Sequence, residues 1–289
     1  MRARSRRNSH SSSARGLKLA AMWAVIASGL GGFGAAAVFL ATRAPDAYAL
    51  CRQGAVPAAS TIVIVDPSDE LTRTHRNRVS VTIRNERDRL PPGGRFSILT
   101  LAPPGSSEPI EVLSVCNPGS PADANPWWET TAKIEKRWKA EYVDPIDGAI
   151  LRVGSTNPTP VSRLIASVAG ALTRPDFDSR VAERRLVIIS DMMENEKGIY
   201  SQLRGGDFWK AYSASPFPRR VTLNLTGVAV EIDYLTRQQY AGIQGEAHRD
   251  FWRRLFSEAG AERVDFIGAL GAPASPIGGE RLVKRQGGE

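Results

Sequence analysis

Short apolar runs alternate with longer amphipathic segments along most of this chain. Residues 61–66 and 185–191 are the clearest buried strands, because mostly aliphatic side chains run without interruption into an aspartate. Further strands are expected at 96–101, 110–115, 221–232 and 263–269, and helices at 70–90, 130–142, 159–172 and 234–258. Apolar strands separated by helices are typical of an α/β fold with a doubly wound, mostly parallel sheet.

Turn residues add detail to this pattern. The predicted strands 96–101 and 110–115 are joined by a short segment rich in Pro and Gly, so we expect them to be antiparallel neighbours. In the helix predicted at 159–172, Thr159 suits the N-cap, and Pro160 suits the first turn, where a missing N–H costs little. Residues 143–154 are expected to form a loop.

The N-terminal segment has a different pattern, because residues 19–42 contain no charged side chain. As a helix this segment would be about 36 Å long, which exceeds the roughly 30 Å of bilayer hydrocarbon. Every charged residue in 1–18 is basic. By the positive-inside rule, residues 1–18 form a cytoplasmic tail, 19–42 a transmembrane helix, and the remainder lies on the far side of the membrane.

A cleaved signal peptide is the alternative interpretation of this segment. Ala47-Tyr48-Ala49 has the small-x-small spacing of a cleavage site. The apolar run is, however, longer than the about 7–15 residues of a signal peptide's hydrophobic region, which favours a retained anchor.

Composition limits the rest of the chain to one globular domain. The sequence has 289 residues, of which 42% are hydrophobic. Residues 59–270 are the expected domain, after a linker at 43–58 and before a disordered tail at 271–289. The net charge of +8 comes largely from the basic residues of 1–18, so it gives the domain no electrostatic footprint for nucleic acid.

The two cysteines, Cys51 and Cys116, both follow the predicted membrane span. If that side is oxidising, one disulfide between them is expected. Two unrelated thiols are the alternative that the sequence leaves open.

Two aspartates terminate two of the predicted strands. Asp66 follows the first strand, and Asp191 ends the strand at 185–191. In a sheet of order 3-2-1-4-5-6 these strands are adjacent, and ligands of open α/β sheets bind where the strand order reverses. This arrangement resembles the von Willebrand factor type A domain, the fold shared with integrin I domains.

The resemblance implies a metal site. That family has an Asp-x-Ser-x-Ser loop after the first strand, a Thr from a second loop and an Asp after the fourth strand. Asp66 and Ser68 match the first two positions of the loop, whereas the third is Glu70 in place of Ser. A magnesium ion would prefer such oxygen ligands. The implied ligands are Asp66, Ser68, Thr159 and Asp191, with Glu70 and Thr156 as doubtful members.

The resemblance also implies how the domain would be used. The metal's open position would take a carboxylate from a partner protein. The alternative interpretation of the same residues is that they accept backbone N–H groups in strand-to-helix turns. In this fold the third strand is antiparallel, so Cys116 would lie near Cys51, at the edge of the sheet opposite the metal site.

Trp127 and Trp128 lie in a proline-rich loop and have two interpretations. They could be exposed residues of a partner-binding surface. They could instead fold back over the core of their own domain, as large aromatic residues more often do.

We therefore expect a protein-binding module of bacterial type, held at the cell membrane and exposed to the periplasm or exterior, with membrane or envelope proteins as partners. The first alternative is a metal-free scaffold subunit of a membrane complex. The second is a phosphatase of the haloacid dehalogenase kind, with Asp66 as its nucleophile. That family needs a second acid two residues later, and this chain has Ser68 there. We expect no enzymatic activity.

The membrane topology can be tested directly. A reporter that is active only in the periplasm should be active when it is fused after residue 289, because basic residues 1–18 should hold the N-terminus in the cytoplasm. Mass spectrometry of the membrane-bound protein should still detect residues 1–49. Activity of a cytoplasmic reporter alone would contradict the topology, and a mature N-terminus after Ala49 would support the cleaved signal peptide.

Overall fold

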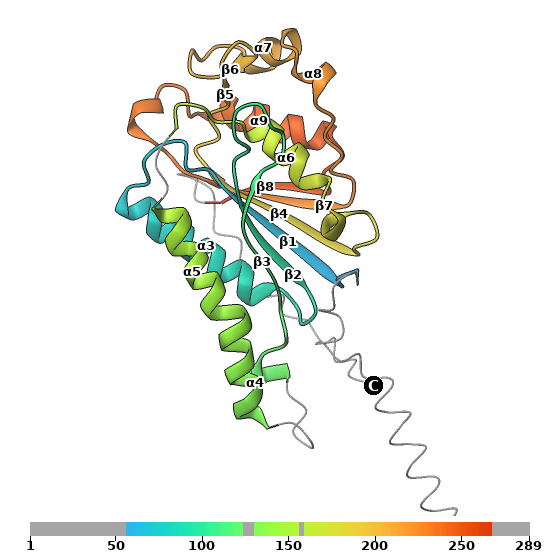
Figure 1. Cartoon of the computed structure of the whole chain (residues 1–289). Helices are drawn as coiled ribbons and strands as arrows, with labels where there is room; N and C mark the ends of the chain where they lie inside the picture. The colour runs from blue at the N-terminus through green and yellow to red at the C-terminus, as the bar shows by residue number, and fades with distance from the viewer. Residues whose placement is uncertain (1–55, 124–129, 156–158, 268–289) are drawn as a thin grey trace, which may run out of the picture. The chain divides into compact units, whose positions relative to one another are not determined.

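A six-stranded sheet forms the middle layer of the computed structural model, which describes residues 56–123, 130–155 and 159–267 (Figure 1). The strand order is β3-β2-β1-β4-β7-β8. All neighbouring pairs are parallel except β2 and β3, which are antiparallel. This confirms the predicted order and the antiparallel edge strand. The strands are Ala59–Val65 (β1), Arg95–Thr100 (β2), Ile110–Cys116 (β3), Glu183–Ser190 (β4), Val228–Tyr234 (β7) and Arg263–Ile267 (β8).

Successive side chains of the central strands enter two separate hydrophobic cores. In β1, Ile62 and Ile64 belong to one core, and Val63 and Val65 belong to the other. All four side chains are fully buried. Because both faces of the strand are covered, the sequence is apolar throughout and does not alternate with polar residues.

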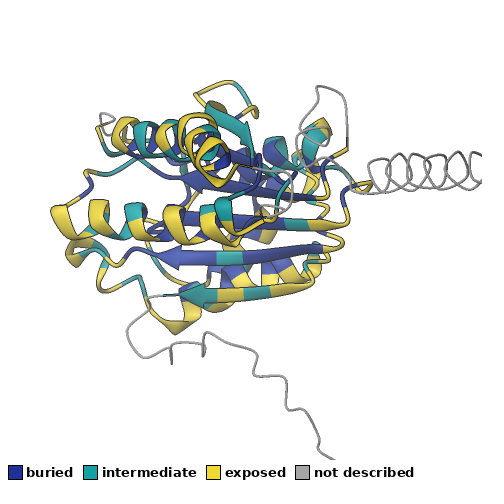
Figure 2. Ribbon diagram, turned by 90° about the horizontal axis from the view of Figure 1, so that it is seen from below, coloured by how far each residue is buried: buried dark blue, intermediate teal, exposed yellow. Residues whose placement is uncertain are grey.

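Helices cover both faces of the sheet (Figure 1). α6 (Leu164–Leu172) and α9 (Glu246–Glu258) pack on one face, and α3 (Arg73–Arg89) and α5 (Asp144–Gly154) pack on the other. Figure 2 shows the buried strands between helices whose outer surfaces are exposed. α3 begins three residues later than predicted, at Arg73, because the hydroxyl of Thr72 accepts a hydrogen bond from the His75 N–H at 3.2 Å and caps the helix there.

The loop predicted at 143–154 is wrong, because the chain there is helical. α4 (Thr131–Trp138) runs into one π-helical turn (Lys139–Val143, η2), and this turn runs into α5. Pro145 is tolerated because it lies in the first turn of α5. Ile146, Ala149, Ile150 and Val153 form an apolar stripe that is buried in the core, and this burial outweighs the helix-breaking tendency of Gly148.

The helix predicted at 159–172 begins later than expected. α6 starts at Leu164, so Thr159 is not its N-cap. The preceding residues are held extended, because Ser162 forms an antiparallel bridge with Asn195, with N···O distances of 3.2 and 2.8 Å. A distant segment of the chain therefore decides where this helix can begin.

Two other predicted starts are also wrong. The strand predicted at 221–232 begins at Val228, immediately after Gly227, which has a φ of 70°. Such a left-handed residue interrupts a strand. The helix predicted at 234–258 begins at Glu246, after a connection that contains a short 3₁₀ turn, Gln238–Tyr240 (η4).

Residues 192–220 contain small elements that the sequence pattern did not predict. They are a two-stranded hairpin of β5 (Asn195–Glu196) and β6 (Tyr200–Ser201), followed by α7 (Phe208–Ala214) and α8 (Phe217–Arg220). Their aromatic side chains join the core next to α9, where Tyr200 and Tyr212 pack with Phe251, and Phe217 packs with both tyrosines. Elements this short have no hydrophobic period long enough to detect.

Several predicted features lie outside the described residues. These are the tail at 1–18, the span at 19–42, most of the linker, the last residues of the predicted domain (268–270), the tail at 271–289, and Cys51, Trp127, Trp128 and Thr156. Within residues 56–123, 130–155 and 159–267, no helix is both long and apolar enough to cross a membrane.

Cys116 is the last residue of β3. It is paired in register with Arg95, the first residue of β2, so it lies at the edge of the sheet where the parallel strands begin. The other cysteine, Cys51, lies outside the described residues, and the pairing of Cys51 with Cys116 stays a prediction.

Non-reducing peptide mapping of the full-length protein should yield a single peptide pair joined through Cys51 and Cys116. In the chain-entropy model this link restricts the unfolded chain and stabilises the fold by about 4 kcal/mol. The variants Cys51→Ser and Cys116→Ser should therefore lose similar amounts of unfolding free energy in urea, and the double variant should lose no more than either. Two thiols that react freely with an alkylating reagent would contradict the link.

Candidate functional site

The two predicted acids meet at the carboxyl edge of the sheet. β1 and β4 are adjacent and parallel, and the Asp66 N–H donates to the carbonyl oxygen of Ile189 at 3.0 Å. Asp66 and Asp191 are 2% and 1% exposed. Two carboxyl groups are thus buried at the point where the strand order reverses.

The Asp66 carboxylate accepts three hydrogen bonds. Its Oδ1 accepts the backbone N–H of Ser68 at 2.8 Å. Its Oδ2 accepts the hydroxyls of Ser162 at 3.1 Å and Ser190 at 2.7 Å. Ser68 therefore contributes its backbone to this group, as in the interpretation of Asp66 as a turn-forming residue.

The Asp191 carboxylate is bound by an arginine that follows β7. Arg237 Nε lies 2.5 Å from Asp191 Oδ2, and the Met193 N–H donates to Asp191 Oδ1 at 3.0 Å. The same guanidinium donates to the carbonyl oxygens of Glu70 at 2.7 Å and Asp69 at 3.4 Å. The Arg237 side chain is 8% exposed, so this cation is an integral part of the folded edge.

Gln244 holds this ion pair in place. Its Oε1 accepts the backbone N–H of Arg237 at 2.6 Å, and its Nε2 donates to the carbonyl oxygens of Asp191 at 3.0 Å and Leu235 at 2.9 Å. A single side chain thus bridges the ends of β4 and β7. The bridge fixes the position of the guanidinium relative to the carboxylate.

Burial raises the pKa of Asp191, and the nearby charge of Asp66 raises it further. Arg237 opposes both effects with its positive charge. The unfavourable free energy of removing the carboxylate from water is therefore larger than the favourable interaction with one guanidinium. At a given pH, Asp191 in the folded protein is protonated to a greater extent than a free aspartate is.

The structure places Thr159 next to Ser68, whose carbonyl oxygen accepts the Thr159 N–H at 3.0 Å. Thr159 is exposed, and its hydroxyl donates to the carbonyl oxygen of Val161 at 3.1 Å. Glu70 is exposed, and its backbone carbonyl, not its carboxylate, contacts Arg237. Ser162 takes the position next to Asp66 that had been predicted for Thr159.

A divalent cation does not fit these donors. Asp66 is occupied by three hydrogen-bond donors, and one oxygen of Asp191 is occupied by Arg237. A metal ion would have to displace the guanidinium and turn two hydroxyl protons away. In the part of the chain that the structure describes, no three His, Cys, Asp or Glu side chains are grouped so that they could hold a metal.

The loop after Asp191 has an unusual backbone. Met192 has a φ of 61°, which is rare for a residue with a side chain and costs about 1–3 kcal/mol. The Trp252 indole N–H donates to the Met192 carbonyl oxygen at 2.9 Å. This conformation brings the Met193 N–H to Asp191, and the next residue, Glu194, accepts the N–H of Ile165 in the first turn of α6 at 2.9 Å.

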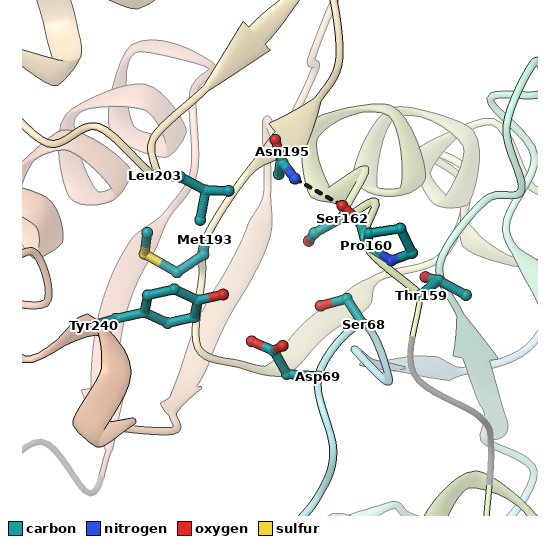
Figure 3. A pocket seen from close by; sticks show the side chains of 9 residues that line it. All are labelled: Ser68, Asp69, Thr159, Pro160, Ser162, Met193, Asn195, Leu203 and Tyr240. Atoms are coloured by element: carbon teal, nitrogen blue, oxygen red, sulfur yellow. Dashed lines mark hydrogen bonds between the residues drawn. The ribbon is translucent and has the colours of Figure 1, made fainter.

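A hollow of about 250 Å³ opens beside the ion pair (Figure 3). Ser68, Asp69, Ser162, Met193 and Tyr240 are among the residues that line it. In Figure 3 the Asp69 carboxylate and the Tyr240 hydroxyl point toward each other across this space. The hollow occupies the edge where the resemblance had placed a metal and its partner carboxylate.

The strand order and the antiparallel β3 are those that the resemblance had implied. The fold is von Willebrand A-like. Solved structures similar to this chain include the VWA domain of SpRpn10, which is 11% identical with a TM-score of 0.35 over 72% of this chain and 86% of that one. No protein-family model and no curated protein matches the sequence.

Two further solved structures have the same low similarity. An aerotolerance-related membrane protein from Bacteroides fragilis is 10% identical, with a TM-score of 0.32 over 72% of this chain and 90% of that one. Proximal thread matrix protein 1 from the mussel byssus is 12% identical, with a TM-score of 0.32 over 73% of this chain and 42% of that one. These likenesses say nothing about what this chain binds.

Arg237, Ser162, Ser190 and Gln244 were not predicted as parts of the site. Ser190 directly precedes Asp191, and Arg237 follows β7 closely. Their positions near the ends of strands could therefore have identified them as candidate site residues. Ser162 and Gln244 had no such signal, because their positions depend on the bridge to Asn195 and on the connection between β7 and α9.

The ion pair gives a pH-dependent prediction. Because the pKa of Asp191 is raised in the folded protein, protonation of this group favours the folded state. Its contribution to the free energy of unfolding is complete below the ordinary aspartate pKa of about 4, and it is lost as the pH rises through the raised pKa. Arg237→Gln should therefore cost about 3 kcal/mol at pH 9, where a buried carboxylate loses its counter-ion, and less at pH 5. Urea unfolding of the full-length protein at both pH values measures this.

Two controls accompany this measurement. Arg180→Gln removes an arginine from a solvent-exposed pair with Asp178 and should change the stability little at either pH. Adding Asp191→Asn to Arg237→Gln should reduce the difference between pH 5 and pH 9. Equal losses for Arg237→Gln at both pH values would mean that Asp191 does not titrate in this range.

Proposed function

We propose that this chain is a metal-free, membrane-anchored protein-binding module whose partner docks at the carboxyl edge of the sheet. The observation that carries the proposal is the buried Arg237–Asp191 ion pair, at 2.5 Å, beside an open hollow. A protein cation fills the position where a metal would otherwise link the domain to its partner. The edge is therefore complete without an added ion.

The donor set supports binding without a metal. Oxygen atoms that could coordinate magnesium already accept hydrogen bonds from Ser68, Ser162 and Ser190. This favours the metal-free scaffold among the two binding interpretations of the sequence. Protein partners in the membrane or cell envelope fit an anchor at residues 19–42 and a domain exposed to the periplasm or exterior.

The hydrolase alternative has little support from the geometry. A nucleophilic carboxylate must be open to its substrate, whereas Asp66 is 2% exposed and its oxygens face three donors. The position of the second acid is taken by Ser68, whose N–H binds Asp66. We therefore propose that the domain acts by binding and not by catalysis.

Site-specific photo-cross-linking tests the binding edge. Leu203 lines the hollow and is 39% exposed, so a benzoylphenylalanine placed there should cross-link the partner in intact cells that make the full-length protein. The matched control is Ser257, an exposed residue near the C-terminal end of α9, close to the opposite edge of the sheet. We expect a discrete product from position 203, none from position 257, and the same yield with EDTA.

Two results would contradict the proposal. Equal yields of cross-linked product from positions 203 and 257 would mean that the carboxyl edge is not a specific binding surface for the partner. Loss of the product in EDTA, together with a rise in melting temperature at millimolar magnesium that Asp66→Ala abolishes, would indicate a functional metal site.

A further inference from the structure

The hollow beside the ion pair combines one acidic side chain with neutral polar and apolar groups. Of the described residues that line it, Asp69 alone is charged at neutral pH. Its side chain is 29% exposed and remains accessible to solvent. Asp69 Oδ2 accepts a hydrogen bond from Gln239 Nε2 at 3.1 Å, and Arg237 Nε lies 3.6 Å from the same oxygen. Arg237 directs its N–H groups to Asp191 and to two backbone carbonyls, and the remaining surface of the Asp69 carboxylate faces the hollow.

Two hydroxyl groups at the hollow already donate hydrogen bonds within the protein. Ser162 donates to Asp66 Oδ2 at 3.1 Å, and Thr159 donates to the Val161 carbonyl oxygen at 3.1 Å. Each oxygen can then only accept a further hydrogen bond. With the Asp69 carboxylate, these atoms are acceptors that an N–H donor of a ligand can contact.

Tyr240 adds a surface that favours a cation. Burial raises the pKa of Tyr240, and the negative charge of Asp69 raises it further, so the phenol keeps its proton. Figure 3 shows the Tyr240 hydroxyl and the Asp69 carboxylate directed toward each other at the hollow. A cation beside the carboxylate would also lie near the face or edge of an aromatic ring, and the ring face attracts positive charge.

One wall of the hollow is apolar, on the side where Figure 3 draws Tyr240. Met193 and Leu203 lie there, and Leu203 is one of the few large apolar residues of the described chain that stay exposed. The volume of about 250 Å³ is below the roughly 300–1,000 Å³ of typical small-molecule sites. It suits one long side chain with an apolar stem and a polar end.

From these observations we propose that the hollow binds a lysine or arginine side chain of the partner protein, with its alkyl stem on Met193 and Leu203 and its charged end at Asp69. This inference rests on the proposed function and names the chemistry of the partner. It reverses the polarity of the metal-site interpretation, in which the partner supplies a carboxylate. Here the protein supplies the carboxylate and the partner supplies the cation.

Methionine-methyl NMR of the full-length protein in nanodiscs can test this inference. The chain has four methionines, of which Met193 lines the hollow and Met192 is buried beside it, while Met1 and Met22 lie far away in sequence. The probes are the N-acetyl amides of lysine, arginine, norleucine and glutamate, and magnesium chloride. We expect lysine and arginine amides to shift the Met193 signal, with affinity at least about tenfold higher than norleucine amide.

A pair of matched variants identifies the charge responsible. Asp69→Asn should abolish the preference for lysine over norleucine, whereas Glu70→Gln, a change at the exposed neighbouring acid, should leave it intact. An unchanged Met192 signal shows that each variant is folded. Equal shifts with norleucine, a stronger response to glutamate amide or to magnesium, no response to any probe, or a lysine preference that survives Asp69→Asn would each overturn the inference.

This test is separate from that of the proposed function. A cross-link from position 203 together with no lysine preference would leave the binding edge in place and refute only the basic side chain. Loss of the position-specific cross-link would refute the binding edge itself, whatever the amides do. When the cross-linked partner peptide is sequenced, a lysine or arginine near the attachment point would agree with the NMR result.

Discussion

Two carboxyl groups, those of Asp66 and Asp191, are buried next to each other at the ends of adjacent parallel strands, and the protein must compensate both. An isolated ionised carboxylate inside a protein is unfavourable by many kcal/mol, and a second one beside it adds repulsion. The chain meets this constraint with hydroxyl and N–H donors at Asp66 and with a guanidinium at Asp191. The rest of the carboxyl edge is arranged so that these partners reach their positions.

Several local irregularities follow from that arrangement. Ser162 can reach Asp66 because its segment is held extended against Asn195. As a consequence α6 begins only at Leu164, two residues after Ser162. Met192 adopts a left-handed backbone that lets its neighbour contact Asp191, and Trp252 of α9 binds its carbonyl oxygen. Features that appear as defects in regular structure thus supply hydrogen bonds to buried acids.

The same compensation changes the chemistry that the edge can offer. A guanidinium cannot exchange its ligands as a metal ion does, and a hydroxyl that donates to a carboxylate cannot donate elsewhere. The charge of the edge is therefore fixed by folding. What is left for a partner is an acceptor-lined hollow with one accessible carboxylate, Asp69, and an apolar wall.

The order of the six sheet strands along the chain follows from the sequence alone. Unbroken apolar runs such as 61–66 indicate strands covered on both faces, the short link between β2 and β3 fixes the antiparallel edge, and the acids at two strand ends locate the switch point. These features depend on local periodicity and chain connectivity, which a sequence records directly. The limits of α6, β7 and α9 and the helix over 144–154 depend on packing and distant backbone pairing instead. The identity of the cation at Asp191 was likewise decided only by tertiary structure, because Arg237 is 46 residues away along the chain and reaches the carboxylate only when β4 and β7 pair.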